Sequence, residues 1–276
     1  MESPNQRRKS TDSLPACTVT RHTYGPNKYN FGDFYLPDSP GPHPVVLLLH
    51  GGFWRAAYDL TLMDKLADSF ARRSIAVWNI EYRRVGNKGG GWPGTLQDVA
   101  LAMDYLRTVA TPLNIDLQRI VPIGHSAGGQ LALWLAGRSR LSQQSPLATP
   151  DTPLTPIGAI SLAGAIDLEL IWQLHLGNGA AEAFLGGSPA AFPERYAAAS
   201  PAALLPLGVP SVLIHGTNDA NVPLTVSQAY TQKALEAGDH VKLIELPNAD
   251  HFAVIDPSSD AWTITLRELQ KLLSGT

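Results

Sequence analysis

The chain has 276 residues, and its 21 lysines and arginines nearly balance its 24 aspartates and glutamates, so that its net charge at pH 7 is −3. Hydrophobic residues make up 44% and charged residues 16% of the chain, which excludes a disordered polymer and gives no general electrostatic reason to bind nucleic acid or anionic lipid. The single cysteine, Cys17, excludes an internal disulfide and a cysteine-rich metal site.

Residues 1–12 are polar and include Arg7, Arg8 and Lys9, with no apolar stretch after these charges. A secretory signal needs such a stretch, so we expect a mobile leader over residues 1–17 instead. The chain also lacks a run of about 18 apolar residues, the length that a membrane-spanning helix requires. With no signal and one free thiol, the expected location is the cytoplasm.

Predicted strands and helices alternate over residues 18–276, which we expect to form a single domain. Mixed alternation over residues 18–36 predicts one or two edge strands. Short runs of β-branched residues and leucine predict strands that are buried on both faces, at 45–49, 75–80, 120–124, 157–162, 211–215 and 241–246. Apolar residues at helical spacing predict helices at 60–72, 95–109, 127–136, 224–237 and 260–273.

This alternation predicts an α/β fold, with a mainly parallel central sheet that helices cover on both faces. Pro122 weakens the prediction of the third buried strand, because proline cannot donate to the ladder. Thr95 is predicted to cap the second helix, with Asp98 three residues later as in a capping box.

The segment from about residue 163 to residue 207 interrupts the alternation. It has no strand pattern, is rich in alanine and glycine, and contains the scattered aromatic residues Trp172, Phe184 and Phe192. We predict a small helical insertion over the carboxyl edge of the sheet, where ligands bind in folds of this kind. The alternative is a structural excursion away from that edge.

Residues 124–128, Gly-His-Ser-Ala-Gly, match the pattern G-x-S-x-G between a predicted buried strand and a predicted helix. The turn from strand to helix leaves little room for side chains, and glycines at both ends relieve the crowding. Ser126 would project at the helix N-terminus, where the helix dipole favours negative charge. The N–H group of Ala127 would point at a developing oxyanion. The pattern therefore predicts Ser126 as a nucleophile.

A second glycine-rich segment, His50-Gly51-Gly52-Phe53-Trp54, directly follows the first buried strand. Gly51 and Gly52 leave the backbone free to turn its N–H groups toward a substrate oxygen, so both are predicted donors of an oxyanion hole. We expect His50 to brace this loop through a hydrogen bond. Trp54 is expected either to wall an acyl pocket or to anchor the loop.

A nucleophilic serine needs a base, and the base needs a carboxylate that orients it. His251 follows the last predicted strand and would face the same sheet edge as Ser126, so it is the predicted base. Asp219 follows the preceding strand at that edge and is the predicted acid. Asp167, which follows an earlier strand, and Asp250, which adjoins the histidine, remain alternatives.

Over residues 18–273 these motifs resemble those of the α/β-hydrolase superfamily, in which the serine, the acid and the histidine follow one another in this order. Residues 50–54 resemble the HGGxW motif of the kynurenine formamidase-like branch and of small carboxylesterases near the hormone-sensitive-lipase group. Residues 124–132 resemble the nucleophile elbow of the same groups.

The resemblance implies an α/β-hydrolase fold and a serine hydrolase that cleaves small carboxylic esters through an acyl-enzyme. The roles carry over to the catalytic residues Ser126, His251 and Asp219 and to the oxyanion donors Gly51, Gly52 and Ala127. Arylformamidase activity on N-formylkynurenine is the alternative that the formamidase-like branch implies. A binding module that kept the fold without catalysis is a lower-ranked alternative, against which the intact set of catalytic residues argues.

Four aromatic residues near these motifs are predicted to contact the substrate: Phe53, Trp54, Trp92 and Phe252. Aromatic walls suit an uncharged acyl or aryl group, so the expected partner is a small-molecule ester or formamide. No metal or organic cofactor is implied, because the histidines and carboxylates near the site are too few and too scattered to form a ligand set. Homodimers are common in the branch that the resemblance indicates, but nothing in the sequence defines an interface.

Overall fold

The computed structural model describes residues 16–149 and 151–275. Within them, eight strands form one sheet in the order β1-β2-β4-β3-β5-β6-β7-β8. β2 pairs antiparallel with β1 and β4, and all other neighbouring strands are parallel. The strands are β1 (Cys17–Thr23), β2 (Phe31–Pro37), β3 (His43–Leu49), β4 (Ala76–Ile80), β5 (Ile115–His125), β6 (Ala159–Leu162), β7 (Ser211–Gly216) and β8 (Val241–Leu246).

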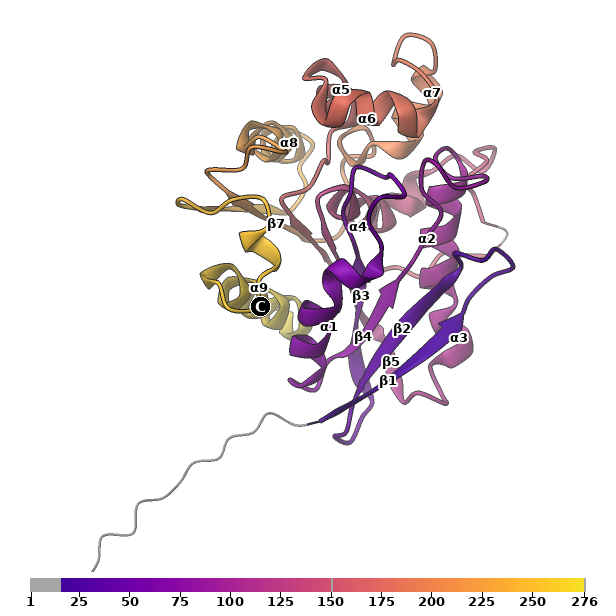
Figure 1. Cartoon of the computed structure of the whole chain (residues 1–276), viewed down its shortest axis with the longest axis vertical. Coiled ribbons are helices and arrows are strands. Elements are labelled where there is room, and N and C mark those ends of the chain that lie inside the picture. Colours follow the sequence, from indigo (N-terminus) through magenta and orange to yellow (C-terminus); the bar gives the residue numbers. More distant parts are fainter. Residues whose placement is uncertain (1–15, 150, 276) are drawn as a thin grey trace, which may run out of the picture.

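Helices cover both faces of this sheet (Figure 1). The α-helices are α1 (Asp64–Ala71), α2 (Gly94–Asp104), α3 (Leu106–Val109), α4 (Ala127–Gly137), α5 (Leu168–Gln173), α6 (Leu176–Leu185), α7 (Pro193–Ala199), α8 (Leu224–Glu236) and α9 (Asp260–Ser274). Short 3-10 helices are η1 (Leu60–Met63), η2 (Arg138–Arg140), η3 (Pro201–Ala203) and η4 (Ala253–Ile255). The sheet and its two helical layers confirm the predicted α/β-hydrolase fold class.

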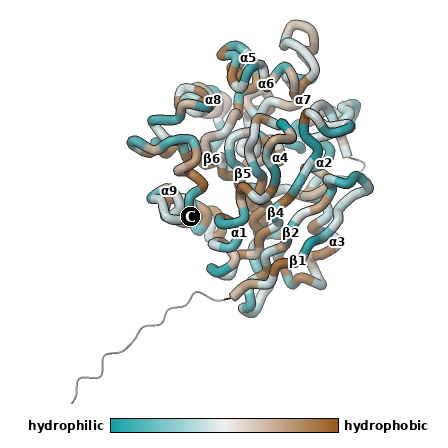
Figure 2. Tube along the Cα trace, viewed as in Figure 1, coloured by the Kyte–Doolittle hydropathy of each residue, from teal (hydrophilic) through white to brown (hydrophobic). Residues whose placement is uncertain are grey.

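The side chains of the central strands alternate between two apolar cores, one on each face of the sheet. On β3, Leu47 and Leu49 belong to the core that α2, α4 and α8 cover, whereas Val46 and Leu48 belong to the core that α1 and α9 cover. Figure 2 shows the resulting apolar centre of the sheet. Each fully buried leucine stabilises the fold by about 1.5–3 kcal/mol, which is why these strands read as continuous apolar runs.

All six predicted strands are present, but the burial predicted for the last one is wrong: β8 lies at the edge of the sheet, and only its Leu246 is buried. Residues 18–36 contain most of the antiparallel pair β1 and β2. The predicted helix at 95–109 is divided into α2 and α3. The predicted cap at Thr95 is wrong, since α2 begins at Gly94 and its N-cap residue makes no side-chain bond. Thr95 instead donates its hydroxyl proton to the carbonyl of Arg83, and Asp98 forms an ion pair with the Arg83 guanidinium at 2.6 Å.

The segment between β6 and β7 contains α5, α6, α7 and η3, which lie together at one end of the molecule (Figure 1). The segment leaves the sheet at the carboxyl end of β6, the edge at which the elbow between β5 and α4 also lies. The predicted leader, residues 1–17, lies outside the described residues except for Ala16 and Cys17, and β1 already begins at Cys17. No helix in the described part of the chain is long and apolar enough to cross a membrane.

Candidate active site

Ser126 lies at the turn between β5 and α4, with a backbone φ of 57° and ψ of −119°. A non-glycine residue at positive φ costs about 1–3 kcal/mol and persists only where its surroundings impose it. Here a Cβ atom at Gly124 would overlap the carbonyl of Gly128, so the turn closes only with glycine at that position. The N–H group of Ser126 donates to the carbonyl oxygen of Leu162 at 2.8 Å, which ties the turn to β6.

The predicted oxyanion residues lie against this turn. A Cβ atom on Gly51 would stand 3.0 Å from the Cβ of Ser126, so only glycine lets the loop approach this closely. Gly52 has a φ of 114°, in the region that favours glycine. Ala127 is the first residue of α4, where backbone N–H groups have no partner within the helix. The structure therefore places both Gly51 and Ala127 next to Ser126.

His50 braces the glycine loop, as predicted. Its ring nitrogens lie 2.7 Å from the carbonyl oxygen of Gly51 and 3.1 Å from Oε1 of Glu81. The ring stacks on Tyr82 with 4.3 Å between the centroids, and the Tyr82 hydroxyl donates to the carbonyl of His50 at 2.7 Å. Because His50 is fully buried, these contacts hold one conformation of the loop that carries Gly51.

Asp219 and His251 meet at the same edge of the sheet. Nδ1 of His251 lies 2.6 Å from Oδ2 of Asp219, and Oδ1 of Asp219 accepts the N–H groups of Asn221 and Val222 at 2.9 and 2.8 Å. Burial opposes ionisation of Asp219, but hydrogen bonds from His215 and His251 outweigh it and hold the pKa of this carboxyl well below its usual range. Asp219 is therefore an ionised acceptor that faces the ring of His251.

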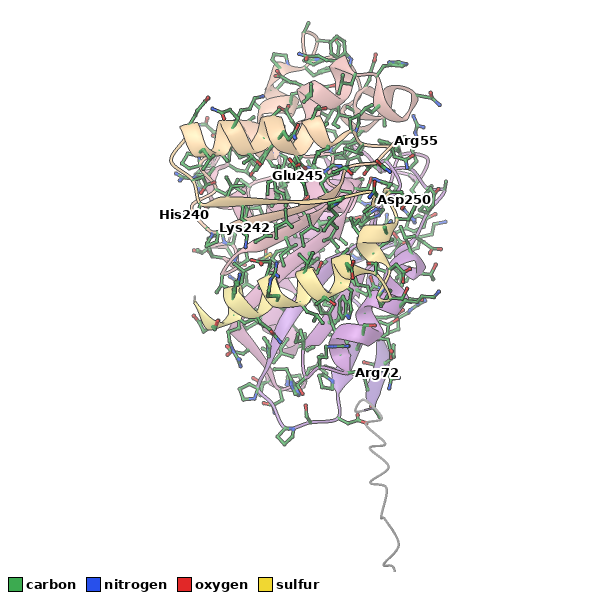
Figure 3. All side chains as sticks on the ribbon, turned by 90° about the vertical axis from the view of Figure 1, so that its left-hand side faces the viewer. Arg55, Arg72, His240, Lys242, Glu245 and Asp250 are labelled. Carbon is green, nitrogen blue, oxygen red and sulfur yellow. The ribbon has the colours of Figure 1, made fainter. Side chains whose placement is uncertain are left out.

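The two alternative acids are engaged elsewhere. Asp167 caps α5 by accepting the N–H of Leu170 at 3.2 Å, and it forms an ion pair with Lys233 at 2.6 Å. Asp250 accepts the N–H groups of Phe252 and Ala253 at 2.9 and 2.8 Å, which closes a local turn. In Figure 3, Asp250 lies on the same side of the molecule as Arg55, which directly follows the glycine-rich segment 50–54, whereas His240 lies at the other end of β8. The structure thus pairs His251 with Asp219 alone among the three candidates.

Trp54 is fully buried and anchors the glycine loop. Its ring stacks on Phe184 of α6 with 4.7 Å between the centroids, and its Nε1 donates to Oε1 of Gln130 on α4 at 2.9 Å. The Gln130 amide in turn donates to the carbonyl of Ala199. Of the two roles expected for Trp54, this geometry favours the anchor, since the ring joins the loop, the elbow helix and the insertion.

The other three predicted aromatic residues are divided between two places. Phe252 is 46% exposed and meets the His251 ring edge-on, with 5.4 Å between the centroids. Phe53 is half-buried against Gly177 of the insertion, where a Cβ atom would stand 2.8 Å from its ring. Trp92 lies apart from both and lines a groove of about 560 Å³ with residues of the 140–146 loop and α7. Phe53 and Phe252 are thus two of the partly exposed aromatics near the site, and Tyr58, which is 46% exposed beside Gly52, is a third that sequence reasoning did not name.

Sequence reasoning missed two buried histidines that contact the pair. Nε2 of His215 lies 3.2 Å from Oδ2 of Asp219, and Nε2 of His125 lies 2.9 Å from the carbonyl oxygen of His251. The only signal in the sequence was position, because His215 ends a predicted strand four residues before Asp219 and His125 directly precedes the elbow serine. Burial, followed by the neighbouring His251, lowers the pKa of His125 to about 3.

His125 should make the protein sensitive to acid. The unfolded chain binds a proton at this histidine near pH 6.5, whereas the folded chain does not until about pH 3. The free energy of unfolding therefore falls as the pH drops through this window, by at most about 1.4 kcal/mol per pH unit. In His125→Gln, we expect the melting temperature to fall less between about pH 7 and about pH 5 than in the wild type. Equal losses in thermal melts of the two proteins would contradict this.

In the described residues, no group of three or more histidine, cysteine, aspartate or glutamate side chains is arranged to hold a metal ion. The fold, the strained serine at its turn and the Asp219–His251 pair define a protein of the α/β-hydrolase class. Within this class, the chain belongs to the BD-FAE family, whose model matches residues 33–234.

Curated relatives are esterases by name. The probable isoprenylcysteine alpha-carbonyl methylesterase ICME of Oryza sativa subsp. japonica is 28% identical over 241 residues, which cover 83% of this chain and 56% of that protein. Esterase LipC of Mycobacterium tuberculosis is 24% identical over an alignment 284 positions long, which covers 93% of this chain and 69% of LipC. The chain thus spans about half the length of the plant relatives that it matches.

Solved structures share the fold. A truncated carbohydrate esterase from gut microbiota superposes with a TM-score of 0.78 at 19% identity, covering 95% of this chain and 98% of that chain. Esterase 2 of Thermogutta terrifontis with bound propionate superposes with a TM-score of 0.74 at 22% identity, covering 95% of each chain.

Proposed function

We propose that the protein is a serine hydrolase that cleaves small carboxylic esters. The observation that carries the proposal is the 2.6 Å contact between His251 and Asp219 at the sheet edge where Ser126 occupies its strained turn. Membership in the BD-FAE family and the esterase names of the relatives support the same reaction. We also propose that residues 18–276 form one hydrolase domain, with residues 163–207 as its helical insertion.

In the proposed mechanism, Asp219 holds Nδ1–H of His251 and thereby leaves Nε2 to act as the base. The Ser126 oxygen attacks the ester carbonyl carbon as its proton passes to His251. The N–H groups of Gly51, Gly52 and Ala127 hold the resulting oxyanion. Collapse of this intermediate expels the alcohol, which takes the proton from the histidine, and leaves an acyl-enzyme.

Water then attacks the acyl-enzyme, and His251 again takes the proton. The second tetrahedral intermediate collapses, Ser126 recovers its proton from the histidine, and the carboxylic acid leaves. Phe252 and Phe53, as partly exposed aromatics near the site, suit an apolar group on the acyl or the alcohol side of the substrate.

Arylformamidase activity is the second candidate, because residues 50–54 resemble the HGGxW motif of the kynurenine formamidase-like branch. The two candidates are separated by one substrate panel: nitrophenyl esters from acetate to octanoate, aryl acetates and N-formylkynurenine. We expect kcat/KM to be highest for one of the esters. Turnover of the formamide far above that of every ester would reverse the order of the candidates.

A further inference from the structure

His215 lies at the end of β7, fully buried, with both ring nitrogens engaged. Nδ1 lies 2.7 Å from the hydroxyl oxygen of Ser227 on α8. Nε2 lies 2.8 Å from the carbonyl oxygen of Val222 and 3.2 Å from Oδ2 of Asp219. The ring therefore spans from α8 to the acid of the proposed triad.

The partners of Nε2 decide where the proton of this ring resides. A backbone carbonyl and an ionised carboxylate can only accept hydrogen bonds, so Nε2 must carry a proton to meet both. The proton on Nε2 points to the Val222 carbonyl at 2.8 Å and lies beside Oδ2 of Asp219 at 3.2 Å, while Oδ2 also accepts from His251 at 2.6 Å. The N–H groups of Asn221 and Val222 occupy the other carboxylate oxygen.

We propose that His215 is a positioning residue of the active site, which holds the Asp219 carboxylate toward His251. This inference rests on the proposed function, since it assigns the residue a part in the same site. The Nε2–H group of His215 restricts rotation of the Asp219 carboxylate and stabilises part of the negative charge on Oδ2. Without this group, the carboxylate turns more freely and the coupled Asp219–His251 pair takes up a proton at higher pH.

Two other titratable groups lie near the Asp219–His251 pair, and the His215 variants described below leave both of them unchanged. His125, from β5, packs its ring 4.6 Å from the His251 ring and donates to the backbone carbonyl of that residue. Asp250, from the loop after β8, directs a carboxylate oxygen to the N–H groups of Phe252 and Ala253. A change in pH dependence on replacement of His215 is therefore assigned to the lost donor at Asp219.

Two polar replacements of His215 distinguish the loss of the Nε2 donor from the loss of the volume of the ring. Glutamine extends its amide nitrogen to the place of Nε2, whereas asparagine reaches only to the place of Nδ1. In His215→Asn, we expect kcat to fall about tenfold with KM nearly unchanged, and the acid limb of the kcat/KM profile to move up by about one pH unit. In His215→Gln, we expect most of the activity and the wild-type profile to return.

His43 offers a matched control. It is also a buried histidine, and its ring nitrogens lie 3.3 and 3.0 Å from the backbone carbonyls of Ser74 and Ser39, at the opposite end of the parallel strands. His43→Gln should lower the melting temperature without moving the pH profile. A folded His215→Asn with the wild-type profile would overturn the proposal, and so would a His215→Gln as impaired as His215→Asn.

A measurement on the unaltered protein covers the case in which the asparagine variant does not fold. ¹⁵N NMR of the imidazole nitrogens at about pH 7.5 should show a protonated Nε2 in His215, and an unprotonated Nε2 would overturn the inference. This readout needs no turnover. If the wild type hydrolyses no ester while Nε2 is protonated, the proposed function fails, whereas the protonation of His215 stands, since the Val222 carbonyl also requires it.

Discussion

Replacement of Ser126 by alanine is expected to lower kcat/KM for the preferred ester by about 10⁴- to 10⁶-fold, because the members of a triad act as a unit. The alanine keeps the backbone of the turn but removes the only atom that forms the acyl-enzyme. Initial rates on the ester panel measure the effect. Circular dichroism and a melting curve should match those of the wild type, since only a hydroxyl is lost.

Ser161 supplies the control for this experiment. It is the residue before Leu162, the last residue of β6. It is buried, and its hydroxyl oxygen has no hydrogen-bond partner among the described residues. Ser161→Ala should keep activity within about threefold of the wild type, because its hydroxyl forms no bond that the site needs. A fluorophosphonate probe should label the wild type and Ser161→Ala and leave Ser126→Ala unlabelled. Full esterase activity in Ser126→Ala would remove the basis of the proposed mechanism.

Replacement of Asp219 by asparagine is expected to lower kcat by about 10³- to 10⁴-fold. The asparagine has nearly the same shape, but its amide can donate to Nδ1 of His251 and then selects the tautomer in which Nε2 carries the proton. In that tautomer Nε2 cannot accept the serine proton. Steady-state kinetics from acid to alkaline pH measure the loss, which should persist across the whole range.

Asp167→Asn is the matched control for the acid. Asp167 keeps its hydrogen-bonding shape as asparagine and can still cap α5, but it loses the ion pair with the half-exposed Lys233. Such a pair is worth about 1 kcal/mol or less, so the variant should retain its activity and lose a few degrees of melting temperature at most. If Asp167→Asn lost activity as Asp219→Asn does, the assignment of the acid would have to be revised.

Positions of the site residues along the chain were predictable because parallel strands all end at one edge of the sheet. The elbow at Ser126 was recognisable from the glycines at 124 and 128, since the turn closes only without side chains there. Asp219 and His251 were recognisable because each follows a strand that ends at that edge. The sequence ranked Asp219 above Asp167 and Asp250, and the structure adds that, of the three, Asp219 is the one in contact with His251, at 2.6 Å.

Contacts between distant segments could not be predicted in the same way. Thr95 and Asp98 form a local capping pattern, but both bind Arg83, which arrives from the loop after β4. The sequence was equally compatible with Trp54 as a pocket wall and as an anchor. The structure favours the anchor, because Trp54 contacts Phe184 and Gln130, which are far away in the chain. In each case a residue more than ten positions away in the chain determines the contacts of the side chain, and the local sequence pattern does not.

The sequence by itself determined the class of fold, the order of the strands along the chain and the turn at which Ser126 lies, because hydrophobic periodicity and the steric demands of a tight turn act over a few residues. Only the tertiary structure decided which carboxylate faces His251, which aromatic ring stays exposed beside it and which buried histidine lies next to Asp219. These choices depend on side-chain directions at the ends of separate strands, and short-range patterns carry no information about how those directions converge.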